Sequence, residues 1–256
     1  MTTADLPRKT WGSPGGSQAL LIHGLSSSAD GWWQVGEHLA DQGWYVTAVD
    51  LRGHGAAGEA TSYAVTDFAS DLLETWPGAA GTSWDLVVGH SLGAAAALLA
   101  AATEASWTKR LVLLDPVLEP SAERLAAIRA SIINDLRAAT AESIAVANPR
   151  WHDKDVRAKV AALKQVKEST VAAVTARPIE WPMAEAATDI SAPTLLVAAD
   201  SDHGGLLSES VGKAIAYDNP NVTFELVEGA GHSLYRDDPI ATLALIDNFL
   251  VDSRGA

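Results

Sequence analysis

The chain has 256 residues and a formal net charge of −14, because 32 acidic residues outnumber 18 basic ones. This balance argues against nucleic acids or anionic membranes as partners, since both bind basic patches. The sequence contains no cysteine, which excludes disulfide bonds, thiolate metal sites and a cysteine nucleophile.

Composition also sets expectations about size and location. With 48% hydrophobic residues, the chain has enough apolar material for a buried sheet flanked by helices. The N-terminus lacks the basic and apolar pattern of a signal peptide, and the longest apolar run, within residues 94–102, is too short to span a bilayer. We therefore expect a cytoplasmic monomer or homodimer that acts on a small molecule.

Short apolar runs alternate with helix-like segments along most of the chain. The strand-like runs are residues 19–22, 45–49, 86–88, 111–114, 194–198 and 222–227, and the chain before His23 has room for one further strand, near residues 8–11. This alternation predicts an α/β fold with a mostly parallel central sheet and helices on both of its faces.

The alternation breaks between residues 117 and 190, where the sequence becomes wholly helical. Leu125, Ile128 and Ile132 recur there at helical spacing. Because both ends of this block adjoin strands, we expect residues 117–190 to form a helical cap over the carboxyl ends of the sheet. Residues 1–116 and 191–256 then form the core of the fold.

A G-x-S-x-G pentapeptide, residues 89–93, lies between a strand-like run and the apolar helix-like run 94–102. A sharp strand-to-helix turn of this kind leaves the hydroxyl of Ser91 exposed, and the flanking glycines relieve the crowding. The turn also places the amide of Leu92 at a helix N-terminus, which favours a developing negative charge. The segment therefore predicts a serine nucleophile and half of an oxyanion site.

A serine hydroxyl needs a base, normally a histidine that is oriented by a carboxylate. His232 has the most suitable setting for this base, on a glycine-containing loop after the strand-like run 222–227. His23 and His54 are expected to brace loops instead. His90 flanks the serine and is expected to point away from it.

Two aspartates are candidates for the carboxylate. Asp202 follows the strand-like run 193–199, and Asp115 follows the run 110–114. Both lie at carboxyl ends of strands, where sites in open parallel sheets are built, and both give the chain order serine, acid, histidine. We prefer Asp202 and keep Asp115 as the alternative acid, while Asp200 is expected to cap or brace its loop.

These segments resemble the α/β-hydrolase superfamily over most of the chain. Residues 21–25 resemble its HG-x loop, residues 50–55 its D-x-R-G-x-G segment, residues 89–93 its nucleophile elbow, and residues 231–239 its histidine loop. Asp202 matches the family's acid after a late strand. The resemblance also implies that the backbone amides of Leu25 and Leu92 form the oxyanion hole.

The motifs and the resemblance together predict a serine hydrolase that cleaves an uncharged, fairly apolar carboxylic ester or lactone through an acyl-enzyme, with no cofactor or metal. The substrate is expected to be uncharged because Arg150, Arg157 and Arg177 are spread through helices and form no cluster. The candidate substrate-binding residues are Gly24, Trp32, Ile132, Trp151, Trp181, Met183 and His203.

Two alternative functions stay open, because one fold supports many chemistries. Hydroxynitrile lyases and cofactor-free haloperoxidases of the superfamily reuse the same triad, and some receptors of this fold keep the triad but turn over very slowly. Cyanide release or halogenation without esterase activity would favour the first class. Tight binding of a ligand that is consumed less than once per protein would favour the second.

Overall fold

The computed structural model describes residues 6–176 and 183–253, and these contain a seven-stranded sheet with the spatial order β1-β3-β2-β4-β5-β6-β7. The strands are β1 (Arg8–Trp11), β2 (Ser17–Ile22), β3 (Trp44–Val49), β4 (Leu86–His90), β5 (Leu111–Leu114), β6 (Thr194–Ala199) and β7 (Val222–Val227). Neighbouring strands are parallel except for β1 and β3, which are antiparallel. The α/β fold and the positions of the predicted strands are confirmed.

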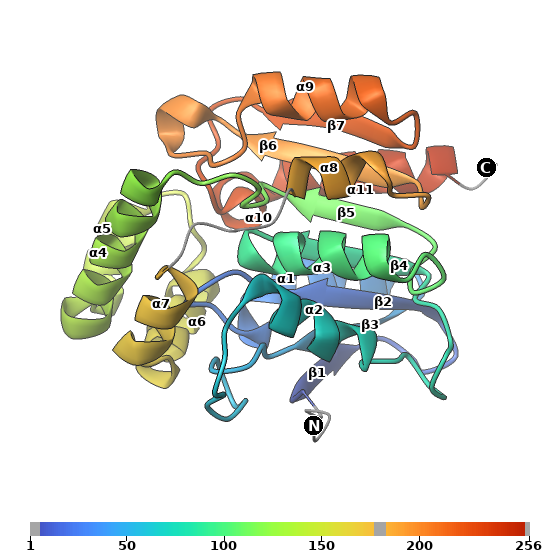
Figure 1. Ribbon diagram of the computed structural model, residues 1–256. Coiled ribbons are helices and arrows are strands. Elements are labelled where there is room, and N and C mark those ends of the chain that lie inside the picture. Colours follow the sequence, from blue (N-terminus) through green and yellow to red (C-terminus); the bar gives the residue numbers. More distant parts are fainter. Residues whose placement is uncertain (1–5, 177–182, 254–256) are drawn as a thin grey trace.

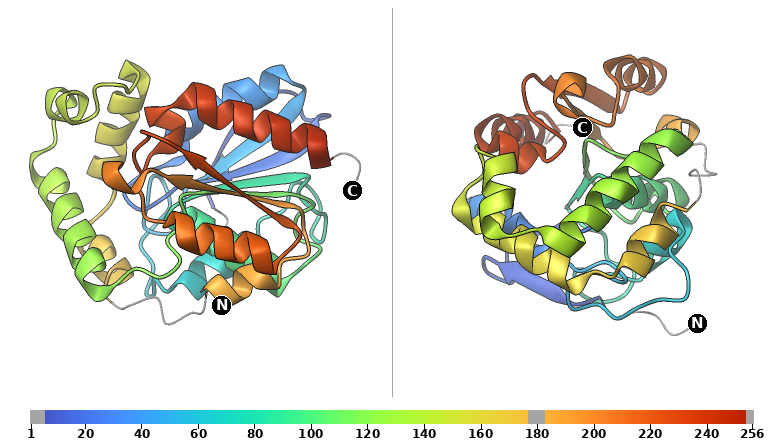
Figure 2. Two further views of the ribbon diagram at one scale, coloured as in Figure 1. Left: turned by 90° about the horizontal axis from the view of Figure 1, so that it is seen from above. Right: turned by 90° about the vertical axis from the view of Figure 1, so that its left-hand side faces the viewer.

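Helices cover both faces of the sheet (Figures 1 and 2). One face is covered by α2 (Val65–Leu73), α3 (Leu92–Thr103), α8 (Met183–Thr188) and α9 (Glu209–Asp218), and the other by α1 (Trp33–Asp41) and α11 (Pro239–Asp252). Three short helices, η1 (Ala29–Trp32), η2 (Ser201–His203) and α10 (Leu234–Asp237), lie in the loops.

Each central strand contributes to two cores, because successive side chains of a strand point to opposite faces. In β2, Leu20 and Ile22 pack with α2 and α3, whereas Ala19 and Leu21 pack with α1 and α11. Burial on both faces explains why the strands read as continuous apolar runs rather than as alternating ones.

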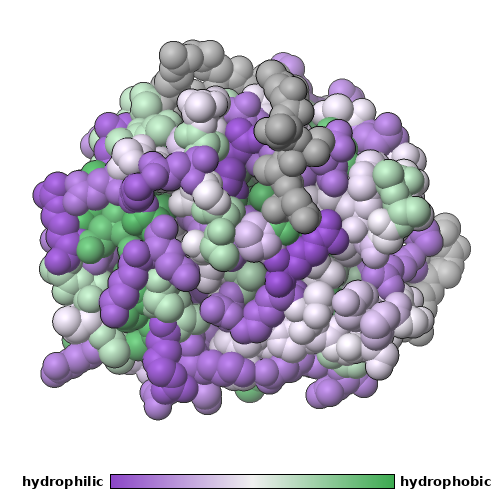
Figure 3. Space-filling model, turned by 90° about the horizontal axis from the view of Figure 1, so that it is seen from below, coloured by the Kyte–Doolittle hydropathy of each residue, from purple (hydrophilic) through white to green (hydrophobic). Residues whose placement is uncertain are grey.

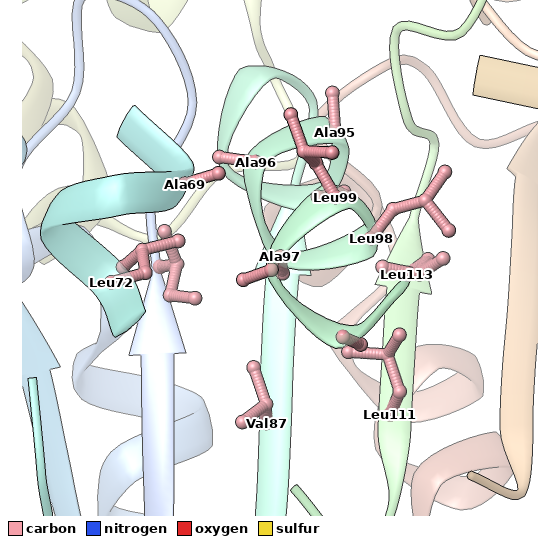
Figure 4. Packing of buried hydrophobic residues seen from close by; sticks show 14 of the residues in the cluster. Ala69, Leu72, Val87, Ala95, Ala96, Ala97, Leu98, Leu99, Leu111 and Leu113 are labelled. Carbon is pink, nitrogen blue, oxygen red and sulfur yellow. The ribbon is translucent and has the colours of Figure 1, made fainter. Parts of the chain in front are cut away.

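Helix α3 is buried along almost its whole length. Figure 4 shows Ala96 and Ala97 directed toward α2, near Ala69 and Leu72, while Leu98 lies on the side of β5. The small alanine side chains let α2 approach closely, and close packing holds an element rigidly. The N-terminus of α3, which follows Ser91, is therefore firmly placed.

Helices α4 (Ala122–Ala138), α5 (Ala141–Ala147), α6 (Asp153–Gln165) and α7 (Glu168–Val174) lie together beyond the carboxyl ends of the strands, at the left of Figure 1. Residues from α4, α6 and α7 line a cavity there. Helix α8 belongs to the same predicted cap but packs instead against α3 and α9 beside the sheet. The helices above the strands are thus α4–α7.

The face of the molecule seen in Figure 3 is mostly hydrophilic, and its hydrophobic patches are small and separated by polar side chains. In the two described ranges, no helix combines the length and the apolar character needed to cross a bilayer.

Candidate active site

Ser91 stands on the sharp turn between β4 and α3, with backbone angles φ 55° and ψ −119°. A positive φ is strained for a residue with a side chain, and such strain is typical of functional sites. Gly93 is required next to it, because a Cβ there would lie 2.4 Å from the carbonyl oxygen of His23. At Gly89 a Cβ would lie 2.7 Å from the Cα of Ala94. The glycines of the pentapeptide therefore permit the close contact of the helix start with the sheet.

Three side chains form a continuous hydrogen-bonded chain at this turn. The Ser91 hydroxyl donates to Nε2 of His232, with an Oγ–Nε2 distance of 2.9 Å. The other ring nitrogen, Nδ1, donates to Oδ2 of Asp115 at 2.6 Å. Asp115 is fully buried, whereas about a third of the His232 side chain (32%) is exposed. The order serine, histidine, carboxylate is the one that activates a hydroxyl.

The preference for Asp202 as the partner of His232 is corrected by this geometry, because Asp115 occupies that position. The register of the sheet explains the difference: His90 pairs with Leu114, so Ser91 and Asp115 follow at the same level on neighbouring strands. Since β5 is paired in turn with β6, Asp115 is also level with Ala198, four residues before Asp202. Asp202 is exposed on the short helix η2, beyond the end of the strand.

Asp115 is held by backbone amides as well as by the histidine. Its Oδ1 accepts from the amides of Ala199 at 3.2 Å and Leu207 at 3.0 Å, and its Oδ2 accepts from the amide of Leu206 at 2.9 Å. Hydrogen bonds from several amides fix the positions of both carboxylate oxygens. The carboxylate is thus fixed in place by the loop that follows β6.

Asp200 braces the loops near η2, as expected from the sequence. Its Oδ1 accepts from the amide of Asp202 and its Oδ2 from the amide of Gly229, both at 2.9 Å. These hydrogen bonds connect the loop after β6 with the loop that carries His232.

His90 makes no hydrogen bond with Ser91 among the described residues and supports the loop of His232. Its Nε2 donates to the carbonyl oxygen of His232 at 2.8 Å, and the two rings lie 4.6 Å apart. Burial lowers the pKa of His90 well below its ordinary value, and the charge of His232 acts in the same direction. A neutral His90 therefore acts as a fixed donor that positions the histidine loop.

Leu25 and Leu92 both line the cavity at Ser91, and their backbone amides donate to no described residue. The loop that carries Leu25 is braced by His23, as expected: its Nδ1 donates to the carbonyl oxygen of Gly24 at 2.8 Å, and its Nε2 accepts from the amide of Leu51 at 3.1 Å. Burial lowers the pKa of His23 to about 4, so this histidine is neutral near pH 7. Two free amides beside a serine hydroxyl form a suitable site for an oxyanion.

A cavity of about 370 Å³ opens above Ser91. Among the predicted substrate-binding residues, Gly24 and Ile132 line it, and Ile132 extends from α4. Apolar side chains of Leu125, Ile128 and Val174 add to the wall on the side of α4 and α7. The volume suits a small molecule.

The other predicted pocket residues lie elsewhere. Trp32 is fully buried and stacks on Tyr235 with ring centroids 4.4 Å apart, so it belongs to the core. Met183 is also fully buried in the core, because α8 packs on the sheet layer. His203 is exposed on η2 and pairs with Asp200. Trp181 lies outside the described residues.

Trp151 does not line the cavity but supports a residue that does. Its Nε1 donates to Oδ1 of Asp237 at 2.8 Å, and the guanidinium of Arg236 lies 4.9 Å from its ring centroid. Arg236 itself faces the cavity.

Sequence reasoning missed three cationic residues of the cavity, Arg124, Lys159 and Arg236. The expectation of an uncharged substrate rested on the absence of an arginine cluster in the sequence, whereas folding brings cations from α4, α6 and α10 to one cavity. Arg236 had one signal, since it lies within the histidine loop, four residues after His232. Nothing in the sequence near Lys159 separates it from a surface lysine.

No metal site is formed by the residues that the structure describes, because no three His, Cys, Asp or Glu side chains converge in 6–176 and 183–253. The chemical groups at the cavity are a nucleophile, a base, a carboxylate, two free amides and the three cations. Such a set is suited to acyl transfer.

A model of the alpha/beta hydrolase family matches residues 19–245, and the chain belongs to this family. Among characterised relatives, 2-(acetamidomethylene)succinate hydrolase from Mesorhizobium japonicum is 28% identical over 253 residues, covering 92% of this chain and 88% of the relative. N-formylmaleamate deformylase from Pseudomonas putida is 25% identical over 241 residues, covering 92% of this chain and 89% of the relative.

The likeness extends to three dimensions. The crystal structure of E-2-(acetamidomethylene)succinate hydrolase matches with a TM-score of 0.81 at 25% identity, over 96% of this chain and 94% of that chain. An enol-lactonase from Burkholderia xenovorans, at 18% identity and a TM-score of 0.76, shares the fold. The family and these relatives assign the chain to the hydrolases.

Proposed function

We propose that the protein is a serine hydrolase that cleaves a carboxylic ester or lactone, with Ser91 as nucleophile, His232 as general base and Asp115 as the orienting acid. The observation that carries this proposal is the hydrogen-bonded chain from Asp115 through His232 to the hydroxyl of Ser91 at the floor of a cavity. Asp115 replaces Asp202 in the role that the sequence had favoured.

The geometry supports a two-step reaction. Nε2 of His232 takes the proton of Ser91 as Oγ attacks the carbonyl carbon, and the amides of Leu25 and Leu92 donate to the resulting oxyanion. The C–O bond to the leaving alcohol breaks, and His232 donates its proton to that alcohol. His232 then removes a proton from water, which attacks the acyl-enzyme, releases the acid and restores Ser91.

The names of two relatives support an amide as a second candidate bond. Both 2-(acetamidomethylene)succinate and N-formylmaleamate are N-acyl compounds. A triad of this geometry attacks the carbonyl carbon of an amide in the same way as that of an ester, with an amine in place of the alcohol. Both named compounds are also small acids, which agrees with a cavity of about 370 Å³.

The test is a panel of 4-nitrophenyl esters of graded acyl length, five- and six-membered lactones and N-acetylated and N-formylated amines. We expect turnover of at least one class by the wild-type protein and none above background by Ser91→Ala, with an unchanged circular dichroism spectrum. Retained turnover in Ser91→Ala overturns the proposal. Cyanide release, halogenation, or binding of a ligand without its turnover would assign the site to one of the alternative functions instead.

A further inference from the structure

The cavity above Ser91 carries a charge opposite to that of the chain. Among its described lining residues are Arg124, Lys159 and Arg236 and no aspartate or glutamate, in a protein whose 32 acidic residues outnumber 18 basic ones. Cations collected in a concave site attract and retain anions. A random selection of side chains from this sequence would give the reverse sign.

Lys159 extends from α6 to the loop that holds the oxyanion amide of Leu25. Its Nζ donates to Oγ of Ser26 at 2.8 Å and to the carbonyl oxygen of Ser26 at 3.1 Å. An ammonium group has three protons, so one donor position stays available for a ligand. Within the described ranges no carboxylate lies within 4.0 Å of this ammonium, so no ion pair neutralises it.

Arg236 is held beside Lys159 by its surroundings. Only 3% of its surface is exposed, its Nη2 donates to Oγ of Ser27 at 3.0 Å, and its guanidinium stacks near the rings of Trp151 and Tyr235. Its Nε has no hydrogen-bond partner among the described residues. The closest carboxylate is Asp155, at 3.8 Å from Nε.

The negative charge of Asp155 is shared with other donors. Its Oδ1 accepts from Nε1 of Trp33 at 2.9 Å and its Oδ2 from Nε2 of Gln34 at 2.8 Å. Among the described residues Asp155 pairs with Arg236 alone, and no carboxylate forms an ion pair with Lys159, so the ammonium beside Ser26 keeps an unpaired positive charge. A single carboxylate on a bound ligand balances that charge.

The crowding of these cations costs free energy in the empty site. Burial and, to a smaller extent, the positive charge of Arg236 together lower the pKa of Lys159 to about 8, while Asp135 opposes both. Like charges in a partly desolvated site are stabilised by an anion that lies between them.

We propose that the substrate carries a carboxylate and that Lys159 and Arg236 bind this group next to Ser26 and Ser27. This inference rests on the proposed function, because it names the class of compound that is presented to Ser91. The apolar side chains of α4 and α7 that line the cavity then contact the rest of the substrate. The exposed Arg124, whose Nη2 donates to the carbonyl oxygens of Gly204 and Gly205, also lines the cavity and adds attraction for anions that approach.

The experiment compares acids with neutral carboxamides of the same shape. The first pair is 4-acetoxybenzoate and 4-acetoxybenzamide, in which the acid carries its charge on the leaving group. The second pair is the 4-nitrophenyl monoester of adipic acid and the 4-nitrophenyl ester of adipic acid monoamide, in which the acid carries its charge on the acyl group. We expect the wild-type protein to prefer the acid in at least one pair. Lys159→Met should lower the acid-to-amide ratio of kcat/KM by about tenfold to a hundredfold, the usual effect of losing a charged hydrogen bond.

Two variants serve as controls. Lys164 lies exposed on the same helix and outside the cavity, so Lys164→Met should leave the ratio at its wild-type value. Lys159→Arg keeps the charge and should restore most of the preference. If Lys159 only braces Ser26, then Lys159→Met lowers kcat/KM for acid and amide equally, and that result overturns the inference. A wild-type protein without preference for the acid in either pair overturns it as well.

The outcome separates this inference from the proposed function. If none of the four compounds is hydrolysed, calorimetric titration of the wild-type protein with 4-acetoxybenzoate still tests whether the cavity binds a carboxylate. Binding that Lys159→Met loses, with no hydrolysis, supports the anion site and counts against the serine hydrolase. Hydrolysis of the amides alone supports the serine hydrolase and overturns the anion site.

Discussion

Replacement of Asp115 by asparagine should inactivate the protein without unfolding it, whereas the same change at Asp202 should have no effect. In Asp115→Asn only one of the two side-chain oxygens is kept. The amide group that replaces Oδ2 cannot accept from Nδ1 of His232, which now lies 2.6 Å from that atom. The imidazole then carries its proton on Nε2 and cannot accept the proton of Ser91.

The magnitude follows from the same change in the serine-protease triad, where aspartate to asparagine lowers kcat about 10⁴-fold. At about 1.36 kcal/mol per factor of ten, this corresponds to roughly 5.4 kcal/mol of lost transition-state stabilisation. The fold also loses one acceptor for the amide of Leu206, which costs about 1–3 kcal/mol of stability. Asparagine tolerates the φ of 41° at this position, so the backbone is preserved.

The assay is kcat on the best ester or amide of the panel for the wild-type protein and both variants, with thermal unfolding as the control for folding. We expect a large loss for Asp115→Asn at a modest decrease in Tm, and wild-type values for Asp202→Asn. An inactive Asp202→Asn together with an Asp115→Asn variant that keeps most of its turnover would refute the reasoning.

Three further predictions concern the elbow and two titrating groups. Gly93→Ala should lower both Tm and activity, because its Cβ would lie 2.4 Å from a backbone carbonyl oxygen; a wild-type Tm would contradict this. The pKa of His23 is lowered to about 4 in the folded protein, so as the pH falls below 6.5 this histidine takes up a proton in the unfolded chain before it does so in the folded protein. The free energy of unfolding therefore decreases as the pH falls from 6.5 to 4. Between neutral pH and pH 4, the free energy of unfolding in urea should fall by about 3 kcal/mol because of His23, a decrease that His23→Gln lacks, and equal pH profiles for both proteins would be the contrary result. Because the pKa of Lys159 is lowered to about 8, KM for 4-acetoxybenzoate should rise between pH 7 and pH 9 as this group loses its proton, and Lys159→Arg should show no such rise.

The fold and two of the three hydrogen-bonded side chains, Ser91 and His232, could be predicted because their signals are local. A strand, a glycine-flanked serine and a helix are adjacent in the sequence, and the loop of His232 follows a strand directly. Asp115 and Asp202 could not be separated in this way, since both follow strands. Which aspartate lies beside Ser91 depends on the register of β5 and β6 relative to β4, and this register is set by strand pairing across the sheet.

The walls of the cavity were the least predictable part. Trp32 and Met183 were chosen for their apolar character, which suits a core position equally well, and both lie in the core. Lys159 reaches the loop of Ser26 only because α6 lies across the carboxyl ends of the strands. Contacts between a cap and a sheet depend on how the two pack, which hydrophobic periodicity along the chain does not specify.

The central claim is that His232 and Asp115 activate the hydroxyl of Ser91. The most direct measurement is covalent labelling with diisopropyl fluorophosphate, followed by intact-mass and peptide mass spectrometry. We expect a single adduct on the peptide that contains Ser91, none in Ser91→Ala, and much slower labelling in His232→Ala. A folded wild-type protein that stays unlabelled, or one labelled at another serine with equal speed in Ser91→Ala, would contradict the account.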